Sequence, residues 1–180
     1  WRANRLRSAS PASSGALCRR VYLDLIGRIP TVAELRAYRS NKGRDKDAEL
    51  VDRLLSSAYD SEYARHWATI WTNLLIGRTG GTERRSPISR QGMSEYLVQS
   101  FLENKPYDVL SRELIGAVGA ARPDMEGYNG AVNFLIGKMD EGGVQATAKT
   151  AQIFLGLAVQ CTQCHNHPFN ETKQNQFWEL

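Results

Sequence analysis

Cys161-Thr162-Gln163-Cys164-His165 lies near the C-terminal end of a chain of 180 residues. Two thiols separated by two residues, with an imidazole directly after the second thiol, form the attachment pattern of a c-type haem. Each thiol adds across one vinyl group of the porphyrin, and the adjacent imidazole becomes the proximal ligand of the iron. The stretch therefore predicts one covalent haem c, bound through Cys161, Cys164 and His165, with the other segments packed around it.

The segments on either side extend this prediction. A helix is expected from about residue 144 to residue 160, leading straight into the motif. One side of it contains small residues that let a flat cofactor approach closely, and we expect Phe154 to contact the haem. The residues on that side are Thr147, Ala151, Phe154, Leu155 and Ala158. After the motif, His167 is expected to hydrogen-bond a haem propionate or a backbone carbonyl.

Two side chains are candidates for the sixth ligand of the iron. His66 lies in a predicted helix rich in aromatic residues, where Trp67 and Trp71 are expected to pack against the porphyrin. The alternative for His66 is a helical histidine that is partly buried and hydrogen-bonded. Methionine is the usual rival ligand and raises the potential of the iron. Met139, next to a loop and closer to the motif than His66, is the weaker candidate.

A structural zinc site is the main alternative cofactor, because CxxC is also half of a zinc knuckle. Cys161, Cys164 and either His165 or His167 would supply three ligands, and a fourth would have to come from far away. Since the chain contains no second CxxC, we favour haem. A redox dithiol is the third option, but it is typical of a βαβ context that this sequence lacks.

Composition excludes several classes of protein. The chain is 42% hydrophobic and 23% charged, which is ordinary for one soluble globular domain. The net charge of +4 is modest and the basic residues are scattered, so nucleic-acid binding is not expected. Three cysteines do not suggest a disulfide framework, and Cys18 is expected to be a small buried apolar residue. No apolar run approaches membrane-spanning length.

Helical periodicity predicts an all-α fold, an irregular multi-helix single domain around the haem. Residues 1–15 form an irregular N-terminal segment, and residues 16–180 form the haem-binding domain. Helices are expected at about 16–28, from Thr31, at 47–56, 61–77 and 89–104, after Pro106, at 144–160 and close to the end. The positions expected to face the core are Tyr22, Leu25, Ile26, Ile29, Leu35, Tyr38, Leu50, Val51, Leu54, Leu55, Tyr63, Trp67, Ile70, Leu74, Met93, Tyr96, Leu97, Phe101, Leu110, Leu114 and Val118.

Several runs of the chain share one resemblance. They are Arg19-Arg20-Val21-Tyr22-Leu23-Asp24-Leu25-Ile26-Gly27, Ile29-Pro30-Thr31, Val51-Asp52-Arg53-Leu54-Leu55, Tyr63-Ala64-Arg65-His66-Trp67, Asn104-Lys105-Pro106-Tyr107-Asp108, and Phe154 through Phe169. Together they resemble the planctomycete-type cytochrome family known as PSCyt2 or DUF1549. The resemblance implies haem binding through CxxCH in large secreted or periplasmic proteins, often beside further domains. The segment from Ile70 to Arg78 departs from the family pattern.

Two functions follow from a haem at this motif. The first is a module that passes single electrons to a partner protein or to a neighbouring domain of the same polypeptide. The second is a haem enzyme or gas-binding domain with an open sixth position. Adjacent helical residues such as Arg65 and His66 point about 100° apart, which argues against a paired distal site. We therefore favour electron transfer over catalysis. Because haem c is attached outside the cytoplasm, we expect a periplasmic or otherwise exported protein, of which this chain is an excised part.

Overall fold

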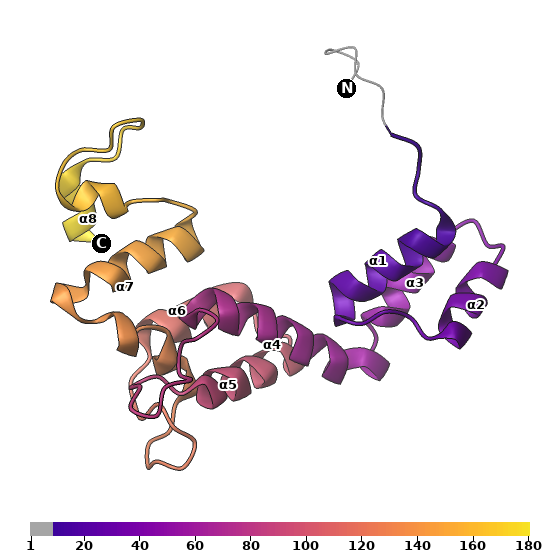
Figure 1. The fold of residues 1–180 in the computed structure, drawn as a ribbon, viewed down its shortest axis with the longest axis horizontal. Coiled ribbons are helices and arrows are strands. Elements are labelled where there is room, and N and C mark those ends of the chain that lie inside the picture. Colours follow the sequence, from indigo (N-terminus) through magenta and orange to yellow (C-terminus); the bar gives the residue numbers. More distant parts are fainter. Residues whose placement is uncertain (1–8) are drawn as a thin grey trace. The chain divides into compact units, whose positions relative to one another are not determined.

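The computed structural model describes residues 9–180, with only the backbone of Glu141, as helices joined by loops (Figure 1). These described residues form no strand, and a single isolated β-bridge joins Ala120 to Tyr128. The all-α prediction is therefore confirmed. The chain divides into two compact units, unit 1 (Trp1–Trp67) and unit 2 (Ala68–Leu180). Of the predicted N-terminal segment, residues 1–8 lie outside the described residues, and helix α1 begins at Ser14.

Unit 1 consists of α1 (Ser14–Ile26), α2 (Val32–Ser40), α3 (Lys46–Leu54), the 3₁₀ turn η2 (Ser57–Tyr59) and the first part of α4 (Asp60–Ile76). Its core lies between the first three helices, and it includes the predicted buried cysteine. The core residues are Cys18, Tyr22, Ile26, Tyr38, Leu50 and Leu54. The apolar stripes of α1, α2 and α3 therefore meet in one cluster, as their helical periodicity predicts.

The ends of α1 and α2 follow from particular residues. Gly27 adopts the left-handed conformation with φ 74° and ends α1 three residues before Pro30. The prediction that Ile29 faces the core is wrong, because it lies beyond this cap and is 56% exposed. The predicted helix start at Thr31 is confirmed by a capping box: the Thr31 hydroxyl accepts from the Glu34 N–H at 3.2 Å, and the Glu34 carboxylate accepts from the Thr31 N–H at 2.6 Å.

The buried face of α4 differs from the prediction. Ile70 and Leu74 were expected in the core but are 41% and 50% exposed. Two alanines, a threonine and the last two apolar residues of the helix occupy the buried positions instead, and the small side chains let the helix pack closely against its neighbours. The buried residues of α4 are Ala64, Ala68, Thr72, Leu75 and Ile76. The predictions for Leu55 and Val118 are also wrong, because each lies just beyond the end of its helix and is exposed.

Unit 2 contains the rest of α4, α5 (Arg90–Leu102), α6 (Tyr107–Gly116), the 3₁₀ turns η3 (Gly130–Phe134), η4 (Ile136–Lys138) and η5 (Glu141–Gly143), and α7 (Val144–Thr150). The remaining elements surround the motif. The core includes Met93, Leu97, Leu110 and Leu114 as predicted. The full set is Ala68, Leu75, Ile76, Met93, Leu97, Leu110, Leu114, Ala131 and Phe134.

A buried asparagine joins the loop before η3 to α5. Asn133 is 0% exposed. Its Oδ1 accepts from the Ser89 N–H at 2.6 Å, and its Nδ2 donates to the carbonyls of Ala121 and Gly130 at 3.0 and 2.9 Å. The segment from 119 to 130 is therefore tied into unit 2 by one side chain. None of the described helices combines the length and hydrophobicity needed to cross a membrane.

Candidate functional site

The chain approaches the motif through a helix that changes form. α7 ends at Thr150 and continues as one π-helical turn, η6 (Ala151–Leu155). Gly156 then takes the left-handed conformation with φ 68°, and the Leu157 N–H donates to the Ala151 carbonyl at 3.1 Å. The prediction of one helix from 144 to 160 is therefore wrong in its last turn, because a glycine at this position caps the helix. Leu155, expected on the inner side, is 54% exposed.

Residues 160–164, which we call the attachment turn, place both thiols on the outside. Gln160–Gln163 form the 3₁₀ turn η7, and Cys164 follows it as the C-cap residue with φ −107° and ψ −27°. Cys161 and Cys164 are both free and exposed. Thr162 lies between them, is 0% exposed and donates through Oγ1 to the Val159 carbonyl at 2.6 Å. The buried threonine therefore anchors the turn, while both thiols remain exposed.

The imidazole of His165 has one nitrogen engaged and one available. Its Nδ1 lies 2.7 Å from the Asn166 carbonyl oxygen. Because a carbonyl only accepts, Nδ1 carries the proton and Nε2 keeps a lone pair. The side chain is exposed next to Cys164. His165 therefore has the tautomer that ligates a metal through Nε2.

His167 has the opposite tautomer. Its Nδ1 accepts a hydrogen bond from the Phe169 N–H at 3.1 Å, so the neutral ring carries its proton on Nε2. The His167 N–H donates in turn to the Thr172 carbonyl at 2.9 Å, which closes a short loop after the motif. This ring is thus prepared to donate rather than to ligate. Its predicted partner, a haem propionate or a carbonyl, stays a prediction.

The last helix contacts the attachment turn through hydrogen bonds. α8 (Gln174–Glu179) directs two donors at the Gln163 carbonyl: the Trp178 indole N–H at 3.2 Å and the Gln174 carboxamide at 3.3 Å. Asn166 Oδ1 accepts from the Gln174 backbone N–H at 3.0 Å. Sequence reasoning missed both residues, since nothing in the order of residues marks a contact to a backbone carbonyl. The only available signal was the amphipathic pattern of the final segment.

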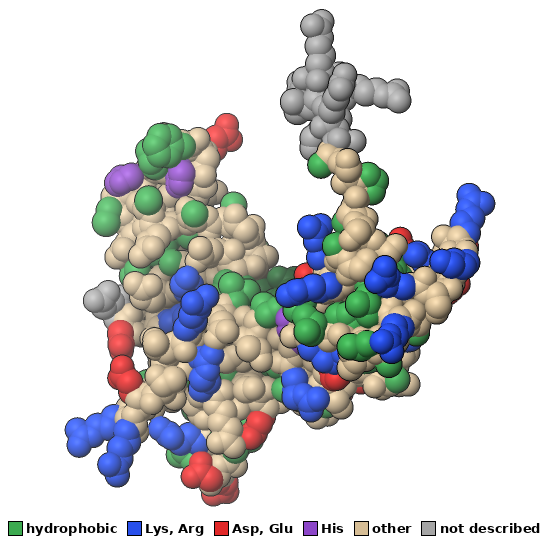
Figure 2. All heavy atoms as spheres, turned by 45° about the vertical axis from the view of Figure 1, so that its right-hand side comes forward, with side chains coloured by type: hydrophobic (Ala, Val, Ile, Leu, Met, Phe, Trp, Pro, Cys, Tyr) green, Lys and Arg blue, Asp and Glu red, His purple; other side chains and the backbone are tan. Residues whose placement is uncertain are grey.

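Apolar side chains remain exposed around the motif. Phe169 is 92% exposed and Trp178 is 57% exposed. The exposed apolar residues of this region are Leu155, Leu157, Phe169, Trp178 and Leu180. Figure 2 shows two histidine side chains at the surface of this part of the chain, close to hydrophobic ones. The free thiols, the Nε2 lone pair and the surrounding apolar surface together fit a covalently held porphyrin.

His66 and Trp67 belong to unit 1, whereas the attachment turn belongs to unit 2. His66 is half-buried, and its ring meets the Trp67 ring edge-on at 5.7 Å between centroids. Among the described residues it makes no hydrogen bond, so its place is fixed by packing against Gly27. The indole Nε1 of Trp67 is buried and also lacks a hydrogen-bond partner within this part of the chain. Their roles at the iron stay predictions.

The other two predicted residues lie in unit 2. Met139 is 59% exposed, between η4 and η5. Phe154 is half-buried and packs edge-on against Phe134, with ring centroids 5.6 Å apart, and against Tyr107 at 6.4 Å. Phe154 thus contributes to the core of unit 2, and its contact with a haem stays a prediction. Over residues 9–180, no three His, Cys, Asp or Glu side chains are grouped so that they hold a metal ion.

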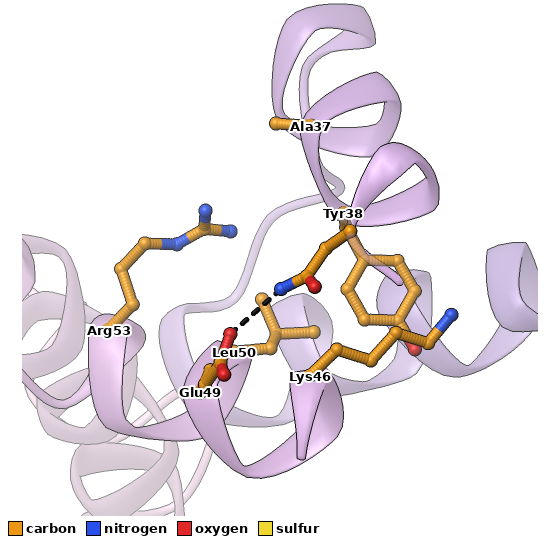
Figure 3. Close-up of a pocket in the computed structure, with 7 residues that line it drawn as sticks. Ala37, Tyr38, Lys46, Glu49, Leu50 and Arg53 are labelled. Atoms are coloured by element: carbon orange, nitrogen blue, oxygen red, sulfur yellow. Dashed lines mark hydrogen bonds between the residues drawn. The ribbon is translucent and has the colours of Figure 1, made fainter. Parts of the chain in front are cut away.

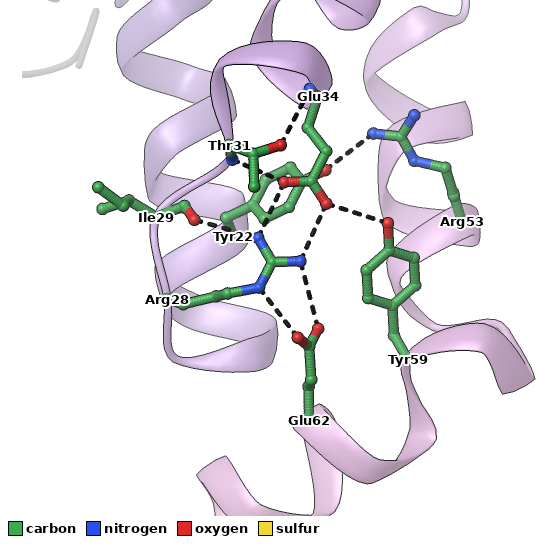
Figure 4. Close-up of polar contacts among 8 residues, drawn as sticks. All are labelled: Tyr22, Arg28, Ile29, Thr31, Glu34, Arg53, Tyr59 and Glu62. Atoms are coloured by element: carbon green, nitrogen blue, oxygen red, sulfur yellow. Dashed lines mark hydrogen bonds and ion pairs between the residues drawn. The ribbon is translucent and has the colours of Figure 1, made fainter.

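Unit 1 contains a polar cluster that sequence reasoning did not identify (Figure 4). Arg28 bridges two carboxylates, with N···O distances of 2.9 Å to Glu34 and 3.0 Å to Glu62. The Tyr59 hydroxyl donates to Glu34 at 3.2 Å, and Arg53 donates to the Tyr22 hydroxyl at 3.1 Å. The Arg28 guanidinium holds the pKa of Glu34 far below its usual range. The cluster ties the end of α1 to the starts of α2 and α4.

Beside it lies a polar pocket of about 160 Å³ between α2 and α3 (Figure 3). Asn41 donates across it to Glu49 at 2.8 Å. The two cations that line it have other partners, since Lys46 donates to Ser14 and lies over the Tyr38 ring, and Arg53 donates to Tyr22. The pocket contains none of the predicted site residues. The attachment turn is therefore the candidate functional site.

The family model described as "PSCyt2: Protein of unknown function (DUF1549)" matches residues 1–180. No curated protein and no solved structure matches the chain.

Proposed function

We propose that this chain, which belongs to the PSCyt2 (DUF1549) family, is a c-type cytochrome domain that carries single electrons. One haem is held by thioether bonds to Cys161 and Cys164, with His165 as the proximal ligand. The family description leaves the function open, so the proposal depends on the geometry of the attachment turn.

The observation that supports the proposal most is the exposure of two free thiols on one short, anchored turn. A haem needs two reactive sulfurs close together in the chain, and Cys161 in η7 and Cys164 at its C-cap have the CxxCH spacing. Both thiols are free and exposed, as addition to the vinyl groups requires. A closed structural zinc site would instead need four ligands directed at one point.

His165 supports the same proposal through its tautomer. The Asn166 carbonyl accepts a hydrogen bond from Nδ1–H and so orients the ring, which leaves Nε2 as the ligating nitrogen. His167, which carries its proton on Nε2, is the donor of the pair. The two histidines therefore have different roles: His165 as a ligand and His167 as a hydrogen-bond donor.

Electron transfer is favoured over catalysis by the surroundings of the motif. The bound haem would supply a one-electron couple, and the chain would set its potential through the axial ligands and the exclusion of water. The exposed apolar residues Leu155, Leu157 and Trp178 provide surface that excludes water when it is covered. An open distal site would instead require a base and an arginine acting together, which the pattern of α4 does not favour.

The location of the domain and the kind of redox partner it would have follow from the same chemistry. Thioether bonds to haem form outside the cytoplasm, so the domain would work in the periplasm or beyond it. Its electrons would pass to a redox protein or to a neighbouring domain of the same polypeptide. His66 and Met139 are the candidates for the sixth ligand.

Mass spectrometry of the exported protein, produced with a cytochrome c maturation system, tests the proposal. We expect the mass of the chain plus one haem, retained after denaturation. The Cys161→Ala/Cys164→Ala variant should carry no covalent haem and serves as the control. A wild-type chain that is exported without added mass, or that carries one zinc ion per chain, would falsify the proposal.

A further inference from the structure

We infer that Trp178 and Gln174 are positioning residues for the attachment turn. Their side-chain N–H groups donate to the Gln163 carbonyl, and this contact fixes the peptide that leads into Cys164 and so the position of the second thiol relative to the first. The inference rests on the proposed function, because it assigns the contact a role in receiving the haem.

The Gln163 carbonyl needs partners from outside its own turn. The last carbonyls of a helix receive no hydrogen bond from within the helix. The same holds for the carbonyls at the end of a short 3₁₀ turn such as η7. Gln163 immediately precedes Cys164. The direction of the Gln163 carbonyl therefore sets the orientation of the peptide group that leads into Cys164, the residue with the second thiol. The indole and carboxamide donors, at 3.2 and 3.3 Å, satisfy this carbonyl together. Any rotation of the Gln163–Cys164 peptide would break both bonds.

Both donors come from one face of α8. Gln174 and Trp178 are four residues apart, the spacing that places two side chains side by side on a helix. A helix of six residues is not stable alone, so α8 depends on its contacts with the other elements of unit 2. Phe177 supplies them: it is 2% exposed and belongs to a cluster with Val144, Ala148, Ala151 and Val159. The cluster thus connects the two donors rigidly to α7.

A second contact locks the same helix to the motif. Asn166 Oδ1 accepts from the first N–H of α8, at Gln174, while its backbone carbonyl accepts from His165. Asn166 therefore couples the orientation of the proximal imidazole to the position of α8. The Trp178 indole N–H is held by its hydrogen bond to the Gln163 carbonyl, yet the side chain is 57% exposed. Trp178 therefore adds apolar surface next to the attachment turn.

The first experiment uses the full chain without haem. Dibromobimane becomes fluorescent when it bridges two neighbouring thiols, so its bridging rate reports how well the thiols are held. Trp178→Phe and Gln174→Met keep shape but remove one donor each. We expect the bridging rate to fall about fivefold for each, the factor that one net hydrogen bond contributes, and further in the double variant. Asn175→Ala removes an amide of α8 that donates only to Glu179, and it should leave the rate unchanged.

Hydrogen exchange of the α8 amides separates positioning from unfolding. Protection retained in the two single variants, together with slower bridging, supports the inference. Bridging at the wild-type rate in the double variant would overturn it, and so would an equal loss of rate in Asn175→Ala.

The second experiment uses the exported protein under cytochrome c maturation. We expect a smaller fraction of haem-bearing chains in Trp178→Phe and in the double variant than in wild type or Asn175→Ala. If wild type takes no haem, the proposed function fails, while the bimane result still decides whether α8 positions the thiols. If wild type and the double variant take haem equally and bridge equally, only the positioning role is overturned.

Discussion

The imidazole of His66 occupies the space that a β-carbon on Gly27 would take, with its Cγ 2.8 Å from that position. Gly27 also ends α1 in the left-handed conformation, at φ 74°. Glycine meets both requirements, since it has no side chain and adopts positive φ without strain. The contact fixes the ring that sequence analysis nominates as a distal ligand, and it joins the end of α1 to α4.

Gly27→Ala tests this contact. We expect a loss of about 2–4 kcal/mol in the free energy of unfolding, from the left-handed backbone and the displaced ring together. In a His66→Ala background the same substitution should cost only about 1–2 kcal/mol, since the backbone strain alone remains. Urea unfolding of the four proteins of the cycle measures both values. Equal costs in the two backgrounds would show that the ring is free to move aside.

Glu34→Gln tests the polar cluster of unit 1. Removing the charge from this carboxylate, which is 19% exposed, leaves Arg28 with a weaker partner. We expect the variant to lose about 2 kcal/mol at neutral pH, because the partly buried hydrogen bonds to Arg28 join two charged groups. The pKa of Glu34 is lowered from 4.5 on folding, so its stabilisation is complete above that pH and is lost as the pH falls through the folded pKa.

The stabilities of wild type and Glu34→Gln should therefore converge in acid. Urea unfolding followed by circular dichroism from neutral pH down to strongly acidic solution checks this. Glu62→Gln leaves the Arg28–Glu34 pair intact and is the matched control, with a smaller loss. A difference between wild type and Glu34→Gln that stays constant with pH would contradict the assignment.

Asn133→Leu tests the hydrogen-bond centre of unit 2. The substitution keeps the volume but leaves the Ser89 N–H and two carbonyls without partners in a buried place. We expect a loss of about 3–5 kcal/mol, measured by urea unfolding. Asn175→Leu, on the exposed side of α8, should change stability by less than about 0.5 kcal/mol. Similar values for the two would mean that water replaces the lost contacts.

Lys138 should make stability depend on pH in the alkaline range, because folding disfavours its charged form. Burial, and then the nearby charge of Lys149, lower its pKa from 10.5 to about 8. Its amine also donates to the Phe134 carbonyl. Between these pH values the unfolded chain binds more protons than the folded one, so this residue makes stability rise with pH.

Lys138→Met should therefore gain stability relative to wild type at neutral pH, and the gain should shrink between about pH 8 and pH 10. Thermal unfolding over this range measures the difference. Lys149→Met removes the neighbouring charge, and the rise should then begin at higher pH. A gain that does not vary with pH would show that the amine stays charged in the folded protein.

The optical and magnetic spectra of the haem-loaded protein identify the distal ligand of the iron. We expect a low-spin iron that becomes high-spin in His66→Ala, because one strong axial ligand is lost. Met139→Leu should leave the spectra unchanged. The reverse pattern would assign the sixth position to Met139, and a high-spin wild type would point to an open site.

Much of the fold follows from local rules. Helical periodicity located the helices of both units to within a few residues, and Thr31 with Glu34 marked the start of α2. The sides of the helices were harder to assign. Ile70 and Leu74 are large and apolar yet exposed, whereas Ala64 and Ala68 are buried. Periodicity detects a stripe of large apolar residues, but only the neighbouring elements decide which stripe is covered.

The candidate site divides in the same way. The order Cys161-Thr162-Gln163-Cys164-His165 determines by itself which reactive atoms the turn contains: two thiols three residues apart and the imidazole that follows the second. The sequence alone also determines that the chain is helical. The tertiary structure decides what holds those atoms in place: the buried Thr162, the Asn166 carbonyl at His165, and the two α8 donors at Gln163. These contacts use backbone acceptors, which every residue possesses, so no residue type announces them before the chain has folded.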